Sequence, residues 1–291
     1  MRRFPLLAAA LVVLGAALAA PPAAAVDAPA PTLDRIKRTG TITFAYRESA
    51  APFSFKDRGG QIRGYSVELC NRVAAAIQKD LGLASLKIEW MPVDASTRIA
   101  VVASGKADAV CGTTTITLTR MQSVDFSVPI FVDGGGVLVR AQSKLSRLTD
   151  LKGKKIAVIG GTTTERAIKR ALDVIEAPAT LVPVKDGAAG VAMLQQGNAD
   201  GYAGDRIVLM GLKADAPNGA DLDFIDGDFS VEPYALVLPR NDPDFRLAVN
   251  RALVALYRSG EIDPIFQRWL GGHGPPGPLL HAMFYLNTLP E

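Results

Sequence analysis

The chain has 291 residues, of which 48% are hydrophobic and 21% are charged. Its 32 basic and 29 acidic residues give a formal net charge of +3. A nucleic-acid-binding domain is usually strongly basic, so no nucleic-acid partner is expected. This length suits one large or two medium domains.

The N-terminus has the pattern of a secretory signal. Arg2 and Arg3 precede an apolar run over residues 6–20, and three alanines at 23–25 suit signal peptidase. The alternative is a membrane anchor, but this run is shorter than the ~20 residues that a span needs. We therefore predict a cleaved signal over residues 1–25 and a soluble, periplasmic mature chain.

Strand and helix patterns then alternate in two series. The first series contains predicted strands at 41–46, 86–91 and 107–111 and predicted helices at 66–81 and 95–104. The second series contains predicted strands at 155–159, 180–184 and 199–203 and predicted helices at 163–173 and 187–196. This alternation predicts an α/β protein with mainly parallel sheets flanked by helices.

A short repeat links the two series. The sequence VASGKAD at 102–108 is matched by LQQGNAD at 194–200. In both copies a glycine, Gly105 or Gly197, follows a predicted helix and can adopt the left-handed cap conformation. The match at equivalent positions predicts two similar lobes.

Two extended runs, at 128–141 and 233–238, predict strands that cross between these lobes, so the first lobe is discontinuous. Helices predicted at 244–259 and 261–270 return to that lobe. The predicted divisions are a first lobe of residues 26–133 and 234–270, a second lobe of residues 134–233, and a Pro- and Gly-rich tail along the surface at residues 271–291.

The usual parts of an enzyme or a metal site are missing. The two histidines, His273 and His281, lie in the predicted tail, away from the strand ends where a catalytic histidine is expected. No phosphate-binding loop or dinucleotide-binding turn is present. We predict a non-catalytic protein with no metal and no cofactor.

Cys70 and Cys111 are the two cysteines of the chain. An even count in an oxidising compartment favours a disulfide. The alternative is a pair of buried free thiols.

Hydroxyl groups and an arginine follow the last strand of the first series. Thr113 and Thr115 come directly after that strand, and Arg120 follows shortly afterwards. Hydroxyls and backbone N–H groups can hold an anion there, and a guanidinium can bind a carboxylate with two hydrogen bonds. The alternative is a helix-capping threonine with a surface arginine.

The second series has a similar arrangement. Thr162 with Glu165 fits a capping box at a helix start, where free N–H groups and partial positive charge favour an anion. Asp205 begins a later helix, and it either caps that helix or points across a cleft at an ammonium group. Together these residues predict a site for an α-carboxylate and an α-ammonium beyond the carboxyl ends of the strands.

At this point the chain resembles the bacterial extracellular solute-binding proteins, family 3, that serve ABC transporters for polar amino acids. The motifs that carry the resemblance are PFSF at 52–55 with GYS at 64–66, SGKAD at 104–108, TITLTR at 115–120 with VDFS at 124–127, LKGKK at 151–155 with GTT at 161–163, and WL at 269–270. TLDRI at 32–36, YRES at 46–49 and RI at 98–99 are most similar to the glutamate/aspartate-binding branch.

This resemblance implies a two-lobed periplasmic-binding-protein-like fold of type II, with two crossing strands. It also implies a monomer that binds a free amino acid and delivers it to the membrane permease of an ABC transporter. Arg120 would hold the α-carboxylate with help from Thr115 and Thr162. Asp205 would receive the ammonium group, aided by Thr113.

Arg47 and Arg98 would hold the side-chain carboxylate of an acidic ligand. Unpaired arginines in a closing cleft cost several kcal/mol, and an acidic ligand provides the missing charge. The alternative for both is a salt bridge to a protein acid such as Glu48.

Two departures from the glutamate/aspartate branch leave other ligands open. Gly187 stands where that branch has a histidine, and Ala95 stands where it has a serine. A longer acidic ligand, or an amide such as glutamine, is therefore an alternative. Two further alternatives are an enzyme like cyclohexadienyl dehydratase, with Asp205 and Glu48 as acid or base, and a sensor module for a signalling receptor.

Overall fold

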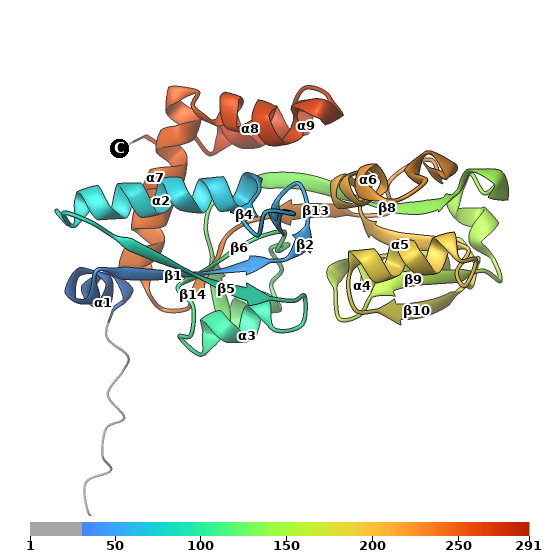
Figure 1. Ribbon diagram of the computed structural model, residues 1–291, viewed down its shortest axis with the longest axis horizontal. Coiled ribbons are helices and arrows are strands. Elements are labelled where there is room, and N and C mark those ends of the chain that lie inside the picture. The colour runs from blue at the N-terminus through green and yellow to red at the C-terminus, as the bar shows by residue number, and fades with distance from the viewer. Residues whose placement is uncertain (1–30, 291) are drawn as a thin grey trace, which may run out of the picture. The chain divides into compact units, whose positions relative to one another are not determined.

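A computed structural model describes residues 31–290, and the predicted signal at residues 1–25 lies outside them. The described chain builds two large sheets and one small sheet, each large sheet flanked by helices (Figure 1). Within this part, none of the helices combines the length and apolar character that a bilayer span requires. The mixed α/β architecture agrees with the alternating pattern of the sequence.

The first large sheet has the strand order β5-β1-β6-β14-β7. β1 pairs in parallel with β5 and β6, whereas β14 runs antiparallel to β6 and β7. Its elements are β1 (Thr41–Arg47), α2 (Tyr65–Asp80), β5 (Lys87–Val93), α3 (Arg98–Ala103), β6 (Ala109–Cys111), β7 (Val124–Phe126) and β14 (Val237–Pro239), together with α1 (Thr32–Thr39), α7 (Pro243–Ser259) and α8 (Ile262–Leu270). The small sheet contains β2 (Ser49–Ala50), β3 (Ser54–Lys56) and β4 (Ile62–Arg63).

The second large sheet has the order β10-β9-β11-β8-β12, and β13 pairs with β8. β9, β10 and β11 are parallel, whereas β8 is antiparallel to its neighbours. Its elements are β8 (Phe131–Arg140), β9 (Lys155–Ile159), α4 (Thr163–Val174), β10 (Thr180–Val184), α5 (Gly187–Gln195), β11 (Gly201–Asp205), α6 (Arg206–Asp215), β12 (Leu222–Phe224) and β13 (Val231–Tyr234).

The described chain passes between the two large sheets at two places. The first is the step from β7 to β8, and the second is the step from β13 to β14. An isolated bridge between Thr115 and Tyr234 joins the end of the β6 loop to the second crossing segment. The predicted crossing strands are therefore present, and the residue limits of the two lobes stay a prediction.

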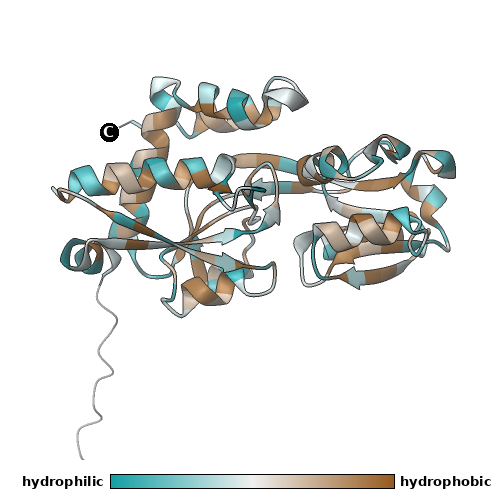
Figure 2. Ribbon diagram, in the orientation of Figure 1, coloured by the Kyte–Doolittle hydropathy of each residue, from teal (hydrophilic) through white to brown (hydrophobic). Residues whose placement is uncertain are grey.

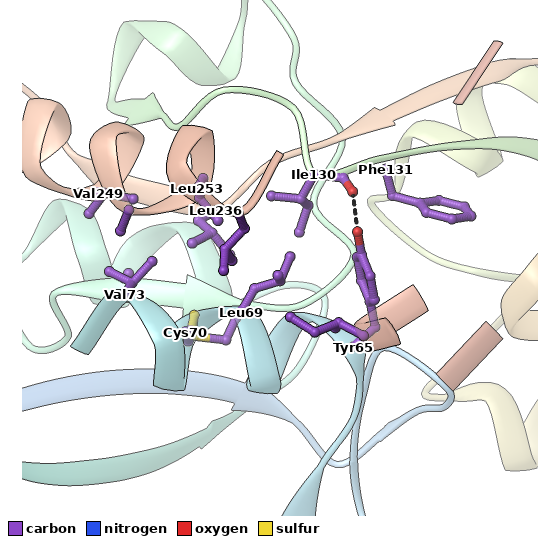
Figure 3. Packing of buried hydrophobic residues seen from close by; sticks show 14 of the residues in the cluster. Tyr65, Leu69, Cys70, Val73, Ile130, Phe131, Leu236, Val249 and Leu253 are labelled. Carbon is purple, nitrogen blue, oxygen red and sulfur yellow. Dashed lines mark hydrogen bonds between the residues drawn. A yellow bond between two sulfur atoms is a disulfide. The ribbon is translucent and has the colours of Figure 1, made fainter. Parts of the chain in front are cut away.

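Buried apolar clusters lie on both faces of each large sheet. Figure 2 shows long apolar stretches in the strands, as burial on both faces requires. In the largest cluster, Leu69 and Val73 of α2 pack among residues of α7 and the crossing segments (Figure 3). The Tyr65 hydroxyl donates to the Ile130 carbonyl over 2.9 Å, which ties the start of α2 to the first crossing segment.

The predicted disulfide is confirmed. The sulfur atoms of Cys70 and Cys111 are 2.01 Å apart, and the bond joins α2 to β6 inside the largest cluster. Both glycines of the sequence repeat have the predicted left-handed conformation, with φ of 72° at Gly105 and 76° at Gly197. A residue with a Cβ would be strained at either position.

Two predicted elements differ most from the structure. The helix expected at 95–104 begins only at Arg98, because the Asp94 carboxylate accepts from the backbone N–H groups of Ser96 and Thr97 and forms a turn there. The expected surface tail contains a helix, α9 (Pro278–Leu286), that adds three buried side chains to the largest cluster. These are Leu280, Met283 and Phe284, whose spacing of three and four residues is the helical signal that the Pro- and Gly-rich composition obscured.

Candidate ligand-binding site

A cavity lies at the carboxyl ends of strands from both large sheets. Arg47 ends β1 and Asp205 ends β11, and the residues after β6 and β9 complete the wall. Six of the seven predicted ligand-binding residues line it: Arg47, Arg98, Thr113, Thr115, Thr162 and Asp205. Open α/β sheets bind their ligands beyond the carboxyl ends of the strands, which is where this cavity lies.

Arg47 and Arg98 are the buried cations of this cavity, with 7% and 3% of their surfaces exposed. Arg98 Nη1 donates to the Ala95 carbonyl over 2.9 Å, but Arg98 Nε has no hydrogen-bond partner in the described chain. Burial, together with the charges of Arg47 and Arg120, lowers the pKa of Arg98 to about 9.

Neither cation is paired with a protein acid. Among residues 31–290, no carboxylate lies within ion-pair distance of Arg47 or Arg98. The alternative of a salt bridge to Glu48 is not observed, since the contact of that carboxylate is with the Tyr46 hydroxyl at 3.4 Å. Two buried guanidinium groups therefore line the cavity without an ion-pair partner, and an anion bound in the cavity would stabilise them.

The Thr115 hydroxyl connects three parts of the chain. It donates to Glu232 Oε2 on β13 over 2.6 Å, and it lies 3.2 Å from the Thr163 hydroxyl at the start of α4. Because the single hydroxyl proton of Thr115 goes to the carboxylate, Thr163 is the donor in the second bond. Glu232 is 2% exposed and also accepts from the Ser230 hydroxyl.

Arg120 does not line the cavity. Its Nη1 donates to the Thr115 carbonyl over 2.6 Å, so its guanidinium lies against the backbone of a lining residue. Burial and the nearby charge of Arg166 lower the pKa of Arg120, while Glu232 and Asp205 raise it. Its position is therefore adjacent to the site.

Thr162 lines the cavity, but its hydroxyl is already used. It accepts from the Glu165 N–H over 3.1 Å and donates to the Ile159 carbonyl over 2.7 Å. The carboxylate of Glu165 accepts from Gly161 N rather than from Thr162 N, so the predicted capping box forms with one bond shifted by a residue. The Thr163 hydroxyl also lines the cavity and bonds to Thr115 rather than capping the helix, and three successive threonines gave the sequence no means to distinguish it.

Asp205 occupies the cap position of α6 without capping it. Its side chain makes no hydrogen bond to the helix, and Oδ1 accepts from the Thr164 hydroxyl over 2.8 Å. Burial raises the pKa of Asp205, and the nearby Tyr234 hydroxyl and the hydrogen bond from Thr164 oppose this rise. The alternative that Asp205 caps its own helix is therefore not found.

Sequence reasoning missed Thr163, Thr164 and the two carboxylates behind the site, Glu232 and Asp133. The first two were hidden in a run of threonines, and the carboxylates lie on crossing strands whose pairing is not readable from one sequence. Glu232 is opposite Asp133 in the register of β13 and β8.

Two α/β sheets joined by two crossing segments, with a cavity at the strand ends of both, define a two-lobed ligand-binding protein. Residues 42–272 match the bacterial extracellular solute-binding proteins, family 3, and the chain belongs to this family.

The chain is 34% identical over 246 residues to the L-glutamate/L-aspartate-binding protein of Pseudomonas aeruginosa, which covers 84% of this chain and 82% of that protein. It is 32% identical over 245 residues to the glutamate/aspartate import solute-binding protein of Salmonella typhimurium, covering 84% and 81%. An ancestral amino acid-binding protein described as a precursor of cyclohexadienyl dehydratase superposes with a TM-score of 0.71 at 28% identity, covering 82% and 99%. The predicted family and fold class are confirmed.

Proposed function

We propose that this protein is the extracytoplasmic binding component of an amino acid ABC transporter and that it holds glutamate or aspartate in the cavity. The observation that carries the proposal is the pair of buried arginines, Arg47 and Arg98, which line the cavity without an ion-pair partner. A second carboxylate on the ligand matches that pair. The glutamate/aspartate-binding relatives support the same ligand class.

The other end of the ligand carries the α-ammonium and α-carboxylate groups. Asp205, with help from Thr113 of the same cavity wall, receives the ammonium group. The α-carboxylate lies beside Thr115 and accepts from the N–H groups at the start of α4 and from the Thr163 hydroxyl, which exchanges its bond to Thr115 for the ligand, with Arg120 behind Thr115. Contacts from both sheets form together only when the lobes are closed, so the ligand favours the closed form.

Closure presents both lobes to the membrane permease, to which the amino acid is delivered. The protein acts in the periplasm as a monomer in this proposal. Its family membership supports the transport role.

Calorimetry on the purified, secreted protein tests the ligand class. Glutamate or aspartate is expected to bind at least about tenfold more tightly than glutamine, which corresponds to about 1.4 kcal/mol. Arg47→Ala is expected to reduce this preference. The matched control is Arg63→Ala, which removes an arginine that lies over the Trp269 ring outside the cavity wall and should leave the preference unchanged. Tighter binding of a neutral or basic amino acid would contradict the proposal.

A dehydratase on this fold is the second candidate, because the ancestral relative is described as a precursor of such an enzyme. Asp205 is a lining carboxylate, whereas Glu48 is not part of the cavity wall. We therefore place binding ahead of catalysis. Turnover of prephenate or arogenate by the purified protein would reverse that order.

A further inference from the structure

The start of α6 presents an unusual capping arrangement. Asp205 stands at the cap position, where an aspartate side chain ordinarily accepts from the N–H of the second or third helical residue. Here it accepts from Thr164 instead. The Ile207 N–H, at the second helical position, would be left without an acceptor unless another group replaced Asp205.

Asp133 of β8 is that group. Its two carboxylate oxygens lie 3.2 and 3.4 Å from Ile207 N. The sheet register explains the placement, because Asp205 pairs with Gly135 on the antiparallel neighbour β8. β8 extends beyond the last residue of β11, so Asp133, two residues before Gly135, reaches the first turn of α6, which lies beside β8 in Figure 1.

The surroundings of Asp133 hold it in this position. It is 8% exposed and accepts from Gly134 N over 2.8 Å and from the Tyr234 hydroxyl over 3.2 Å. Burial and the nearby charge of Asp205 raise the pKa of Asp133 to about 8. A protonated carboxyl at Asp133 still offers an acceptor oxygen to Ile207 N.

We propose that Asp133 is a positioning residue for the ammonium group of the ligand: by capping α6 in place of Asp205, it leaves the Asp205 carboxylate directed at Thr164 and the cavity. This inference rests on the proposed function, in which Asp205 receives the ammonium group. Without Asp133, rotation of the Asp205 side chain onto its own helix satisfies Ile207 N and withdraws the carboxylate from the ligand.

The test compares L-glutamate with glutarate, which has both carboxylates and no amino group. Asp133→Ala is expected to weaken glutamate binding by about tenfold or more while changing glutarate binding by less than about threefold. In an Asp205→Ala background, Asp133→Ala is expected to change neither affinity, because the group that it positions is already gone. A residue that merely stabilised the fold would weaken both ligands together.

Three further variants complete the design. Asp133→Leu keeps the branched side-chain shape without an acceptor, and it replaces Asp133→Ala if that variant does not fold. Asp133→Asn keeps an acceptor oxygen and should retain glutamate affinity within about threefold. Asp242→Ala is the matched control, since Asp242 caps α7 through the Phe245 N–H and is not part of the cavity wall, and it should leave the ratio of glutamate to glutarate affinity unchanged.

The outcomes separate the two proposals. If Asp205→Ala binds glutamate as tightly as the unmodified protein, the ammonium assignment fails and the positioning role fails with it. If Asp205→Ala weakens binding while Asp133→Ala and Asp133→Leu do not, or weaken glutarate equally, the positioning role alone is overturned.

Discussion

The starts of α4 and α6 face the same cavity but satisfy their backbone N–H groups differently. At α4 the cap residue Thr162 uses its own hydroxyl, which accepts from Glu165 N. At α6 the cap residue Asp205 makes no bond to the helix, and Asp133 of β8 accepts from Ile207 N instead. A side chain engaged in capping supports the fold, whereas one released from capping is available to a ligand. In the proposed function, this difference separates the polar residues of the cavity wall that support the fold from those that contact the ligand.

Asp133, which caps α6 in place of Asp205, should make the stability of the protein depend on pH. Asp133 has a folded-state pKa of about 8, above the ordinary value of 3.8, so between these values the unfolded chain binds fewer protons than the folded protein. The free energy of unfolding therefore falls as pH rises, by up to about 1.4 kcal/mol per pH unit and up to about 4 kcal/mol between pH 5 and 8. This stabilisation is fully present below the pKa of the unfolded chain, and it is lost once the pH rises above the pKa of the folded protein.

Chemical denaturation at several pH values measures this effect. Asp133→Asn cannot titrate, so its stability should fall less steeply over the same range. Asp205 and Tyr234 face Asp133 and remain in both proteins, which makes the difference in slope the relevant quantity. Equal slopes would mean that Asp133 is ionised in the folded protein across this range.

Asp205→Ala should have the largest effect on binding. In the proposed function Asp205 receives the ammonium group, so its loss is expected to weaken glutamate binding by about a hundredfold, or about 2.7 kcal/mol. Stability should change little, because Asp205 does not cap α6. Calorimetry and thermal unfolding together measure the two effects.

The matched control for Asp205 is Asp186, which does cap its own helix. Its carboxylate accepts from Ala189 N at the start of α5 over 2.9 Å. Asp186→Ala should therefore lower stability by about 1 kcal/mol. If Asp205→Ala destabilised the protein as much as Asp186→Ala, the contrast between the two kinds of helix start would be lost.

Arg120→Ala tests the α-carboxylate end of the ligand. Because Arg120 reaches the backbone of Thr115 behind the α4 side of the cavity, its loss should weaken glutamate binding by about tenfold, or about 1.4 kcal/mol. Unchanged affinity by calorimetry would remove Arg120 from the site and leave its bond to the Thr115 carbonyl as its role.

Local patterns in the sequence predicted much of this fold, because hydrophobic periodicity and helix-ending glycines are local signals. β9 and β10 have the predicted limits, and Gly105 and Gly197 end their helices as expected. The composition of residues 271–291 concealed α9, whose apolar face is stabilised by tertiary packing rather than by propensity.

The candidate site was predictable in residue type but not in hydrogen-bond assignment. Six predicted residues line the cavity, yet which of Thr162 and Thr163 caps the helix depends on the backbone conformation at the start of α4. The capping of α6 by Asp133 depends on the register of β8 against β11, which joins residues far apart in the sequence. Long-range pairing of this kind is not encoded in any local pattern.

The smallest expected effects separate the two neighbouring threonines at α4. Thr162→Ala removes the cap and should lower the free energy of unfolding by about 1 kcal/mol, because Glu165 N loses its acceptor. Thr163→Val removes a hydroxyl that bonds only to Thr115 among its side-chain contacts in residues 31–290, so stability should change by less than about 0.5 kcal/mol. Glutamate affinity should instead fall about fivefold, equal to about 1 kcal/mol. The opposite result would be a loss of affinity in Thr162→Ala and a loss of stability in Thr163→Val. It would mean that the Thr162 hydroxyl gives up its bond to the helix and binds the ligand when the lobes close.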